Sequence, residues 1–455
     1  MGGATGETVS RAPVRTSFAP TAMVGLRLSR PHGKWEAMKI TKIETVHLGD
    51  YPHILFIGVH TDEGLVGWGD TYYMTDAVRG YIHQFAAPML LGHDPLAIEL
   101  HWRRLYEVIA HIAGKGAEIR GLSALDVALW DILGQAAGMP IWQVLGGAAR
   151  DRIKTYNTCG GPTYGRPTRG GSGYGTDSAT PGRYEDLIGF MTAADELALD
   201  LLSEGITGMK IWPFDYAVHA PGTWDNWRNF KGAFDPDLRT LGGQQISNSD
   251  LDRALEPFRK IRAAVGDKME IMVEGHGFWS LPAAKKIGRA LEEFKPYWLE
   301  DLMRADDIGA LAELGRSVTT PILASEYLTT RYEYKPVLEA RAADIIMIDP
   351  TWAGGITESK KIATMAETYK RPVAMHDCTG PFTLYAGVHL AINATNAVYQ
   401  ESLRSYLRVT YPDLVTEIVT VEDGHILAPT APGLGTTLLP DVRKRADVTV
   451  VESAL

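Results

Sequence analysis

Three glutamates recur at a constant spacing, each at the end of a short apolar run. Glu274 ends MEIMVE, Glu300 ends PYWLE and Glu326 ends PILASE, so each follows the previous one by 26 residues. If the runs are neighbouring strands, their carboxylates meet at one edge and repel one another in a partly dry site. A divalent cation removes that repulsion, and an all-oxygen ligand set favours Mg²⁺ over zinc. The spacing therefore predicts a metal site.

The next two apolar runs end in Asp349 and His376. A carboxylate beside an imidazole fixes its tautomer and raises its basicity, so this pair predicts a catalytic base. The alternative is a buried structural histidine with a hydrogen-bond partner, but the position at the same strand ends as the glutamates favours catalysis. The last run ends in Glu401, a candidate hydrogen-bond donor or acceptor for the substrate.

Lys210 and Trp212 lie two residues apart in GMKIWPFD and so share one face of a predicted strand. The Lys210 ammonium suits neutralisation of a substrate carboxylate or of a developing enolate oxygen. Trp212 can pack or donate a hydrogen bond, but a neutral indole cannot serve as a base. A purely structural role at a strand end is the alternative for Trp212.

Eight short apolar runs, most of them separated by amphipathic stretches, make up residues 152–415. Alternating β and α units with near-continuous apolar strands predict a parallel sheet, and eight of them predict a TIM-type barrel. The carboxyl ends of barrel strands converge on one mouth, where long loops also lie. Two long polar stretches, 160–182 and 219–250, are expected beside that mouth.

The segments outside the barrel have different patterns. Residues 38–151 predict an α+β domain with alternating strands and a helix over 123–138, for which Ser123 is the expected N-cap and Gly138 the end. Residues 416–455 carry a strand–turn–strand pattern that we expect to return to this domain. Residues 1–37, rich in Gly, Ser, Pro and Thr, are predicted to be a disordered extension.

The composition of the chain excludes several classes of partner. The chain has 455 residues, 45% of them hydrophobic, and a formal net charge of −10, which disfavours nucleic acid. A run of 18 apolar residues is lacking, so no membrane span is expected. Two cysteines, Cys159 and Cys378, suit a reduced, cytoplasmic protein rather than a disulfide framework.

The order of these site residues, with SALDVALWDILG, IDPTWAGGITES and APGLG, resembles the mandelate racemase and muconate lactonizing enzyme branch of the enolase superfamily. The resemblance extends from about Met38 to the C-terminus. It implies a modified (β/α)7β TIM-type barrel with an N-terminal α+β capping domain. It also implies one Mg²⁺ per active site, assisting proton abstraction α to a carboxylate, and, by analogy, a homo-oligomer.

Two departures from the family pattern and one further histidine bear on which reaction of the family is expected. The first metal ligand is usually Asp in this branch, where this chain has Glu274, and the second lysine of a Lys-x-Lys racemase pattern is replaced by Trp212. His276, two residues after Glu274, resembles the Asp-x-His pattern of mannonate- and galactonate-type dehydratases, in which the histidine serves the departing hydroxyl. A loop histidine that supports the metal shell is the alternative.

The sequence therefore predicts a dehydratase of an acid sugar, either an aldonate or an aldarate. His376, oriented by Asp349, takes the C2 proton, Lys210 and Glu401 help to stabilise the ene-diolate, and His276 or the protonated His376 assists loss of the 3-hydroxyl. A sugar-acid epimerase or racemase, a cycloisomerase and a catalytically silent metal-binding barrel are the alternatives. The residues expected to contact the polyol are Trp212, Tyr156, Tyr51 and Tyr72.

Overall fold

The computed structural model describes residue 2 and residues 38–112, 114–165, 182–219 and 243–455. The predicted extension at 1–37, apart from residue 2, and most of the two long polar stretches lie outside these residues. Residues 38–455 form one compact unit, which contains all the elements described below.

A closed barrel of eight parallel strands forms the centre of the larger part of this unit. Each strand pairs with the next in sequence, and β11 pairs with β4 to close the ring, as the run of eight apolar segments predicted. Nearly all strand residues are buried, which explains their continuous apolar character. The barrel strands are β4 (Arg152–Thr158), β5 (Gly208–Ile211), β6 (Glu270–Glu274), β7 (Trp298–Glu300), β8 (Ile322–Ala324), β9 (Ile345–Ile348), β10 (Val373–Met375) and β11 (Ala397–Ser402).

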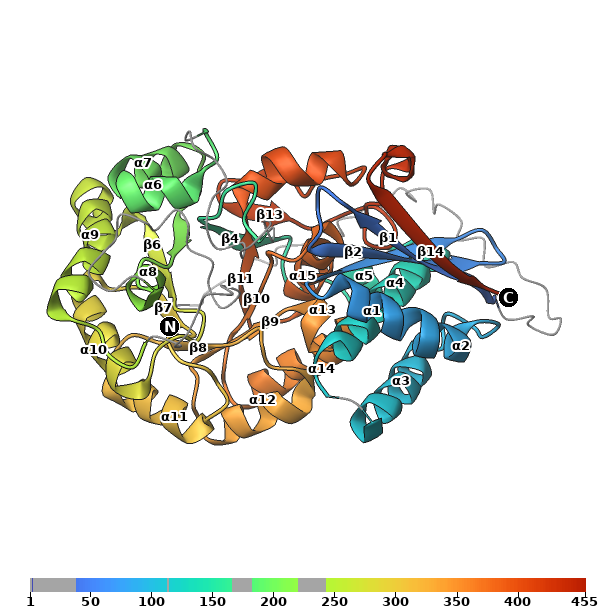
Figure 1. Cartoon of the computed structure of the whole chain (residues 1–455), viewed down its shortest axis with the longest axis horizontal. Helices are drawn as coiled ribbons and strands as arrows, with labels where there is room; N and C mark the ends of the chain where they lie inside the picture. The colour runs from blue at the N-terminus through green and yellow to red at the C-terminus, as the bar shows by residue number, and fades with distance from the viewer. Residues whose placement is uncertain (1, 3–37, 113, 166–181, 220–242) are drawn as a thin grey trace. The chain divides into compact units, whose positions relative to one another are not determined.

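Helices connect these strands, and the longer ones pack around the outside of the ring (Figure 1). Local signals fix their ends: α9 begins where the Ser247 hydroxyl accepts from the Asp250 amide, and it ends at Gly266 with a φ of 57°. The helices are α6 (Asp186–Thr192), α7 (Ala194–Ser203), α8 (Asp215–His219), α9 (Asn248–Val265), α10 (Leu281–Leu291), α11 (Ile308–Ser317), α12 (Thr330–Glu339), α13 (Pro350–Ala353), α14 (Gly355–Thr368) and α15 (Pro381–Asn393).

The capping domain combines an antiparallel sheet with helices. The sheet has the order β14-β1-β2-β3, with β1 (Ile40–Leu48), β2 (Ile54–Thr61), β3 (Val66–Tyr72) and β14 (Val448–Ala454). Its helices are α1 (Thr75–Tyr81), α2 (Ala87–Leu90), α3 (Ile98–Ile112), α4 (Ala117–Ala137) and α5 (Ile141–Val144).

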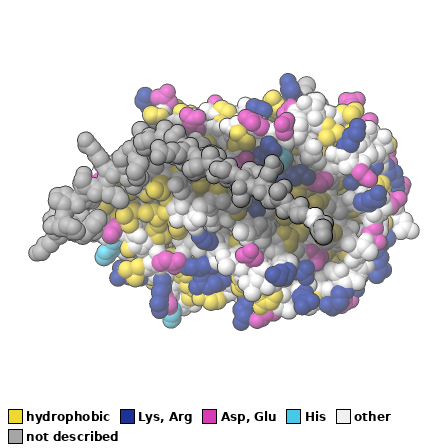
Figure 2. All heavy atoms as spheres, turned by 180° about the vertical axis from the view of Figure 1, so that it is seen from behind, with side chains coloured by type: hydrophobic (Ala, Val, Ile, Leu, Met, Phe, Trp, Pro, Cys, Tyr) yellow, Lys and Arg dark blue, Asp and Glu magenta, His cyan; other side chains and the backbone are white. Residues whose placement is uncertain are grey.

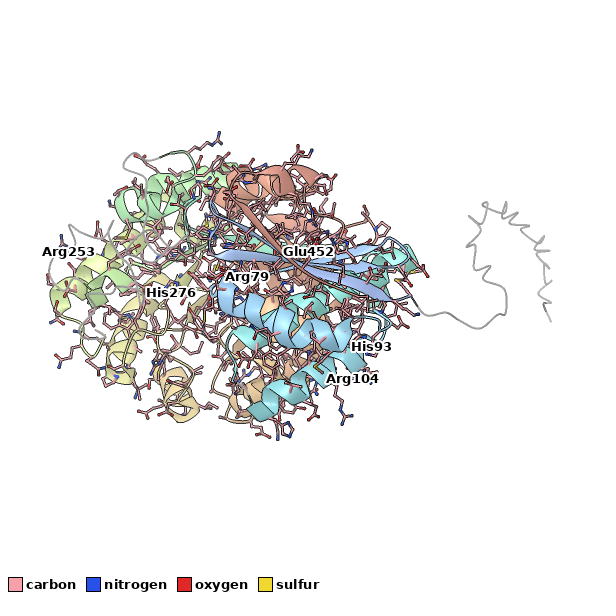
Figure 3. All side chains as sticks on the ribbon, turned by 45° about the vertical axis from the view of Figure 1, so that its right-hand side comes forward. Arg79, His93, Arg104, Arg253, His276 and Glu452 are labelled. Carbon is pink, nitrogen blue, oxygen red and sulfur yellow. The ribbon has the colours of Figure 1, made fainter. Side chains whose placement is uncertain are left out.

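Different strands of the C-terminal segment pair with the capping sheet and with the barrel sheet. Strand β14 pairs with β1, and its Glu452, labelled in Figure 3, accepts from Lys42 Nζ at 2.7 Å. The hairpin of β12 (Val421–Glu422) and β13 (His425–Leu427) instead pairs with barrel strand β4. The hairpin therefore extends the barrel sheet, and β14 is the strand that joins the capping sheet.

Helix α4 starts six residues before the expected N-cap. Ser123 lies inside the helix, and its hydroxyl donates to the Ile119 carbonyl one turn earlier, at 2.6 Å. A serine in a helix interior makes this back-bond instead of a cap, so the N-cap prediction was wrong. The other end agrees with the prediction, because Gly138 adopts the left-handed conformation with a φ of 66°.

Two buried aspartates of the capping domain bind the first turns of barrel helices. Asp70 on β3 accepts from the Phe382 amide at 2.8 Å and the Thr383 amide at 3.0 Å, at the start of α15. Asp126 on α4 accepts from the Thr357 amide at 2.9 Å, at the start of α14. Because a helix N-terminus presents unpaired N–H groups and positive charge, these contacts hold the capping domain over the barrel.

The surface seen in Figure 2 mixes both charge signs. Outside the grey atoms, Lys and Arg side chains on this face lie among Asp and Glu side chains. Among the residues described, no helix is long and apolar enough to cross a membrane.

Candidate functional site

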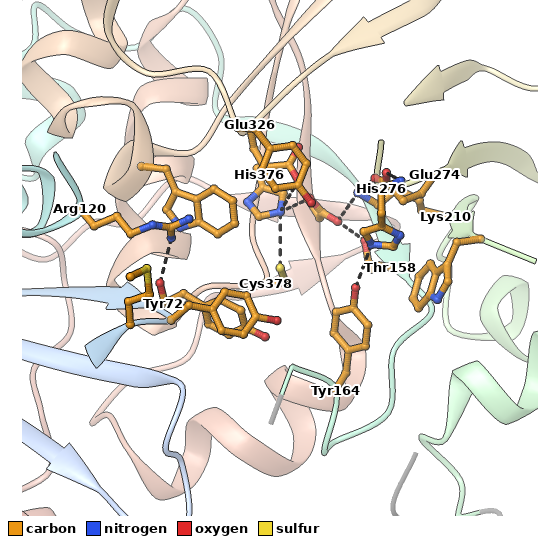
Figure 4. A pocket seen from close by; sticks show the side chains of 16 residues that line it. Tyr72, Arg120, Thr158, Tyr164, Lys210, Glu274, His276, Glu326, His376 and Cys378 are labelled. Atoms are coloured by element: carbon orange, nitrogen blue, oxygen red, sulfur yellow. Dashed lines mark hydrogen bonds and ion pairs between the residues drawn. The ribbon is translucent and has the colours of Figure 1, made fainter. Parts of the chain in front are cut away.

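A pocket of about 230 Å³ opens at the carboxyl ends of the barrel strands, beneath the capping domain (Figure 4). Both parts of the unit supply its walls. The capping domain gives Tyr72, Tyr73, Met74 and Arg120, and the barrel gives Thr158, Tyr164, Lys210, Trp212, Glu274, His276, Glu326, Tyr327, Trp352, His376, Cys378 and Glu401.

Lys210 is the centre of a buried charge cluster at the floor of the pocket. Its Nζ lies 2.8 Å from Glu300, 2.8 Å from Glu401 and 3.5 Å from Glu274. Burial disfavours the ammonium, but the charges of Glu300 and Glu401 outweigh that cost and hold the pKa of Lys210 well above its usual value. Lys210 therefore remains a cation in contact with three of the predicted carboxylates.

The carboxylates that surround Lys210 are almost inaccessible to water, and their pKa values differ accordingly. Burial raises the pKa of Glu300 well above its usual value, and burial also raises that of Glu326. For Glu274, burial is outweighed by the positive charges of His276 and Lys210, which lower its pKa. The cluster thus carries more acidic groups than one lysine can neutralise at low cost.

The residues predicted to hold a metal fit a hard cation in chemistry. Glu326 Oε2 and Asp301 Oδ1 are buried without a hydrogen-bond partner among the described residues, and carboxylate oxygens are ligands that a hard cation such as Mg²⁺ prefers. Among those same residues, however, no three His, Cys, Asp or Glu side chains converge as a preformed metal site. The Lys210 ammonium lies between Glu274 and Glu300 in this arrangement.

His376 is held by a carboxylate, as predicted for a base. Its Nδ1 lies 2.7 Å from Asp349 Oδ2, and Asp349 is fixed in turn by the Thr351 amide at 2.7 Å and the Thr379 hydroxyl at 2.8 Å. Nε2 faces the pocket and lies 3.4 Å from Cys378 Sγ. Burial disfavours the imidazolium, but the acidic groups around it, Cys378 first and then Glu401 and Glu326, hold the pKa of His376 well above its usual value.

His276 reaches the same pocket by a turn and not by continuation of the strand. Strand β6 ends at Glu274, and His276 has a φ of 44°, in the left-handed region that few non-glycine residues adopt. Glu274 stabilises this turn by accepting from the His276 amide at 2.6 Å. The imidazole is held by Asp215, whose Oδ2 lies 2.5 Å from Nδ1, while Nε2 lies 3.3 Å from the Tyr164 hydroxyl.

The predicted polyol contacts divide into two groups. Trp212 and Tyr72 line the pocket. Tyr156 does not, because it points into the barrel interior against Trp298 and Tyr399, one layer below Thr158 on the same face of β4.

Tyr51 also lies away from the pocket. It is buried in the capping domain, and the Arg445 guanidinium lies 5.8 Å from its ring centroid. The loop 49–53 therefore directs Tyr51 toward the C-terminal segment and not toward the barrel mouth.

Several residues of the site were not among the sequence candidates. Asp215 follows the strand by four residues in PFD, a spacing that gives no periodic signal. Arg120 lies on a capping helix, and its guanidinium stacks on Trp352 at 3.8 Å. Cys378 follows His376 by two residues, beyond the end of β10, so strand periodicity gives no signal for it.

Two family profiles match the chain and together cover most of it. Residues 35–146 match the N-terminal domain of the mandelate racemase / muconate lactonizing enzyme family, and residues 193–442 match the enolase C-terminal domain-like family.

Curated relatives and solved structures agree with these profiles. A D-galactonate dehydratase from Xanthomonas axonopodis pv. citri (strain 306) is 30% identical, with 90% of this chain and 94% of the relative covered. One from Ralstonia nicotianae (strain ATCC BAA-1114 / GMI1000) is 31% identical, with 88% and 91% covered. An enolase of the mandelate racemase subgroup from Agrobacterium tumefaciens is 41% identical at a TM-score of 0.77, with 91% and 99% covered. A putative dehydratase from Zymomonas mobilis ZM4 is 26% identical at 0.77, with 92% and 100% covered.

Proposed function

Because the chain belongs to the mandelate racemase and muconate lactonizing enzyme branch of the enolase superfamily, we propose that it is a hydro-lyase that converts an acid sugar to a 2-keto-3-deoxy acid. The observation that carries this proposal is a pair of His–Asp dyads, His376–Asp349 and His276–Asp215, in one pocket with the Lys210 cluster. D-galactonate, the substrate in the names of the relatives, is the first compound to test.

His376, in its neutral form, is the proposed base for the proton at C2. Asp349 fixes Nδ1, so Nε2 is the atom that faces the ligand and accepts the proton. The Cys378 thiol, whose pKa burial raises to about 11, lies 3.4 Å from Nε2. The electron pair of the broken C2–H bond moves into the carboxylate, which forms the ene-diolate.

His276 is the proposed acid for the departing hydroxyl. Its Nδ1 is held by Asp215, so Nε2, which lies near the Tyr164 hydroxyl, delivers a proton to the 3-hydroxyl. The C3–O bond breaks, water leaves, and the resulting enol becomes the 2-keto acid by taking a proton at C3. Abstraction and elimination thus use two different histidines.

Lys210 and the glutamates provide the electrostatics of the reaction. The Lys210 ammonium lies where it can stabilise negative charge on the substrate carboxylate. Glu274, Glu300 and Glu326 are the residues that would hold Mg²⁺, which when bound supplies positive charge for the ene-diolate. Glu401, fixed by Lys210, Thr158 and the Asp377 amide, completes the floor of the pocket.

A C2 epimerase is the second candidate, and the same two dyads favour it. Two imidazoles, each held by a carboxylate, could remove and return a proton at one carbon. The two reactions give different products, since a dehydratase releases a keto acid and an epimerase returns a C2 epimer.

The test combines a substrate panel with solvent exchange. With Mg²⁺ present, the protein is incubated in D₂O with acid sugars, starting with D-galactonate, and keto-acid formation and C2 deuterium are followed by NMR. We expect His376→Asn to lose both dehydration and exchange, and His276→Asn to lose dehydration but keep exchange. Formation of C2 epimers without keto acid would establish the epimerase and overturn the dehydratase.

A further inference from the structure

Arg120 places a positive charge at the end of the pocket away from Lys210. In Figure 4 Arg120 lies on one side of His376, and Lys210, Glu274 and His276 lie on the other. Arg120 projects from the first turn of α4 in the capping domain, whereas Lys210 belongs to barrel strand β5. The pocket therefore has two cationic ends, supplied by different parts of the fold.

The two cations differ in how far the protein neutralises them. Lys210 has three glutamate partners within 3.5 Å. Arg120 has no ion pair within 4.0 Å to any carboxylate that the structure describes. The carboxylate of Asp349, which acts on Arg120 electrostatically, already accepts from His376 and Thr379.

The guanidinium is also held in place, and within the described part of the chain it makes one hydrogen bond. It stacks on the Trp352 ring at 3.8 Å and donates one hydrogen bond to the Tyr72 carbonyl at 2.9 Å. A guanidinium carries five N–H donors in a planar fork, which matches the two oxygens of a carboxylate. Stacking and one backbone contact fix the plane of the fork without neutralising its charge.

The surroundings show which end of a substrate would meet Arg120. Met74 and Tyr327, which line the same pocket, are 64% and 46% exposed, while Lys210 is 3% exposed. A substrate that places its reacting carboxylate in the buried charge cluster and C2 at His376 would extend its far end toward Arg120. That far end is a neutral hydroxymethyl group in an aldonate and a second carboxylate in an aldarate.

We propose that Arg120 binds the distal carboxylate of the substrate, so that this protein acts on a sugar diacid in preference to the corresponding monoacid. The inference rests on the proposed dehydratase function and specifies its substrate class. It departs from the curated relatives, whose names state D-galactonate, a monoacid. The Arg120 guanidinium gains no charged partner from a hydroxymethyl group, whereas a carboxylate forms charge-assisted hydrogen bonds with it.

The experiment compares substrates that differ only at C6. Galactarate is paired with galactonate, and glucarate with gluconate, and kcat/KM is measured for each with Mg²⁺. We expect the diacid to be favoured in the pair whose configuration the enzyme accepts. In Arg120→Gln the diacid-to-monoacid ratio of kcat/KM should fall about 50-fold, the loss typical of a charged hydrogen bond.

A ratio within one variant is insensitive to the fraction of folded protein, so partial unfolding of Arg120→Gln does not obscure the result. Arg120→Lys keeps the charge but loses the fork, and it should show an intermediate ratio. Arg103→Gln, an exposed arginine on α3 of the same domain, should leave the ratio unchanged.

The outcomes separate the two proposals. Dehydration of monoacids in preference to diacids, or a ratio unchanged in Arg120→Gln, overturns the role of Arg120 and leaves the dehydratase intact. Failure to dehydrate any acid sugar overturns the proposed function and, with it, the substrate class.

Discussion

At the scale of single residues, the two catalytic candidates share one arrangement. His276 and His376 each present Nε2 to the pocket because an aspartate holds Nδ1. The aspartates come from different places, since Asp349 follows barrel strand β9 as the N-cap of α13 and Asp215 begins the short helix α8. The arrangement therefore depends on tautomer control by two carboxylates.

Replacing Asp215 tests the proposed acid, His276, and leaves the proposed base, His376, unchanged. Asp215→Asn loses the acceptor that fixes the His276 tautomer, so we expect dehydration to slow about 10- to 100-fold while C2 deuterium exchange continues. NMR of the substrate and product pools in D₂O measures both. Asp349→Asn is the matched control, and it should slow dehydration and exchange together. Equal loss of exchange in both variants would assign Asp215 to substrate binding or folding.

Glu300 provides the test of metal binding. Its Oε1 accepts from Lys210 at 2.8 Å and its Oε2 from the Trp298 indole at 3.0 Å, so Glu300→Gln keeps the shape but removes a charge. We expect the Kd for Mg²⁺, measured by titration calorimetry, to rise about 10- to 100-fold, which corresponds to about 1.4 to 2.8 kcal/mol. Chelation should abolish activity, and added Mg²⁺ should restore it.

Glu270 is the matched control for that experiment. It begins strand β6, at the end of the barrel away from the pocket, and pairs with Lys154 at 2.8 Å. Glu270→Gln should leave Mg²⁺ affinity unchanged. Full activity after exhaustive chelation, or parental Mg²⁺ affinity in Glu300→Gln, would contradict the metal assignment.

At the scale of elements, helix N-termini connect the capping domain to the barrel. Both carboxylate oxygens of Asp70 accept hydrogen bonds from amides in the first turn of α15. The carboxylate can come this close because residue 380 is a glycine, since a Cβ at that position would lie 2.3 Å from Asp70 Oδ2. Asp70 thus acts as an N-cap supplied by another part of the chain.

Replacing Asp70 measures the strength of this connection. Asp70→Asn turns one acceptor oxygen into a donor that faces a backbone N–H, and we expect a loss of about 2 kcal/mol in the free energy of unfolding. Burial raises the pKa of Asp70 to about 7, so urea unfolding is measured at pH 8, where the carboxylate is ionised.

Asp307 provides the comparison for Asp70. It caps α11 on the surface by accepting from the Ala310 amide at 3.0 Å. Asn is an equally good N-cap there, so Asp307→Asn should change the stability by less than about 0.5 kcal/mol. Similar losses of unfolding free energy in the two variants would show that Asp70 stabilises the fold no more than an ordinary surface N-cap does.

The same elements show what the sequence could predict. Each of the six predicted residues lies within two residues of the end of a barrel strand, and strand ends of a parallel barrel converge, so they could be identified from the sequence: Glu274, Glu300, Glu326, Asp349, His376 and Glu401. Arg120 could not, because its place in the pocket depends on how a capping helix docks. His276 was identified from its resemblance to the Asp-x-His pattern, but the left-handed turn after β6 that brings it to the pocket could not be predicted.

At the scale of the whole compact unit, buried ionisable groups link folding to pH. His389 on α15 is fully buried: its Nδ1 accepts from the Trp142 amide at 3.2 Å and its Nε2 donates to the Leu434 carbonyl at 2.9 Å. Helix α15, the capping helix α5 and the C-terminal segment meet at this side chain. Burial lowers the pKa of His389 to about 4.

This shift predicts the direction of acid destabilisation. The unfolded chain protonates His389 near its ordinary pKa of about 6.5, while the folded protein keeps it neutral until about pH 4. Above pH 6.5 both states are neutral and His389 adds no pH dependence. As the pH falls from 6.5 to 4, the unfolded state binds the extra proton, and the folded state loses up to about 3 kcal/mol of stability.

The variant His389→Gln isolates this contribution, because every other titrating group cancels in the difference between variant and parent. At pH 7 the variant should be less stable, since it loses packing and hydrogen-bond geometry. As the pH falls to 4.5 only the parent loses stability through His389, so the difference in unfolding free energy between parent and variant, measured with urea at several pH values, should shrink by about 2 to 3 kcal/mol.

Leu434→Val is a non-titrating change in the same region, and its difference in unfolding free energy from the parent should stay constant with pH. A constant difference for His389→Gln as well would mean that His389 titrates alike in the folded and unfolded chains, and that water reaches the contact between α15 and the C-terminal segment.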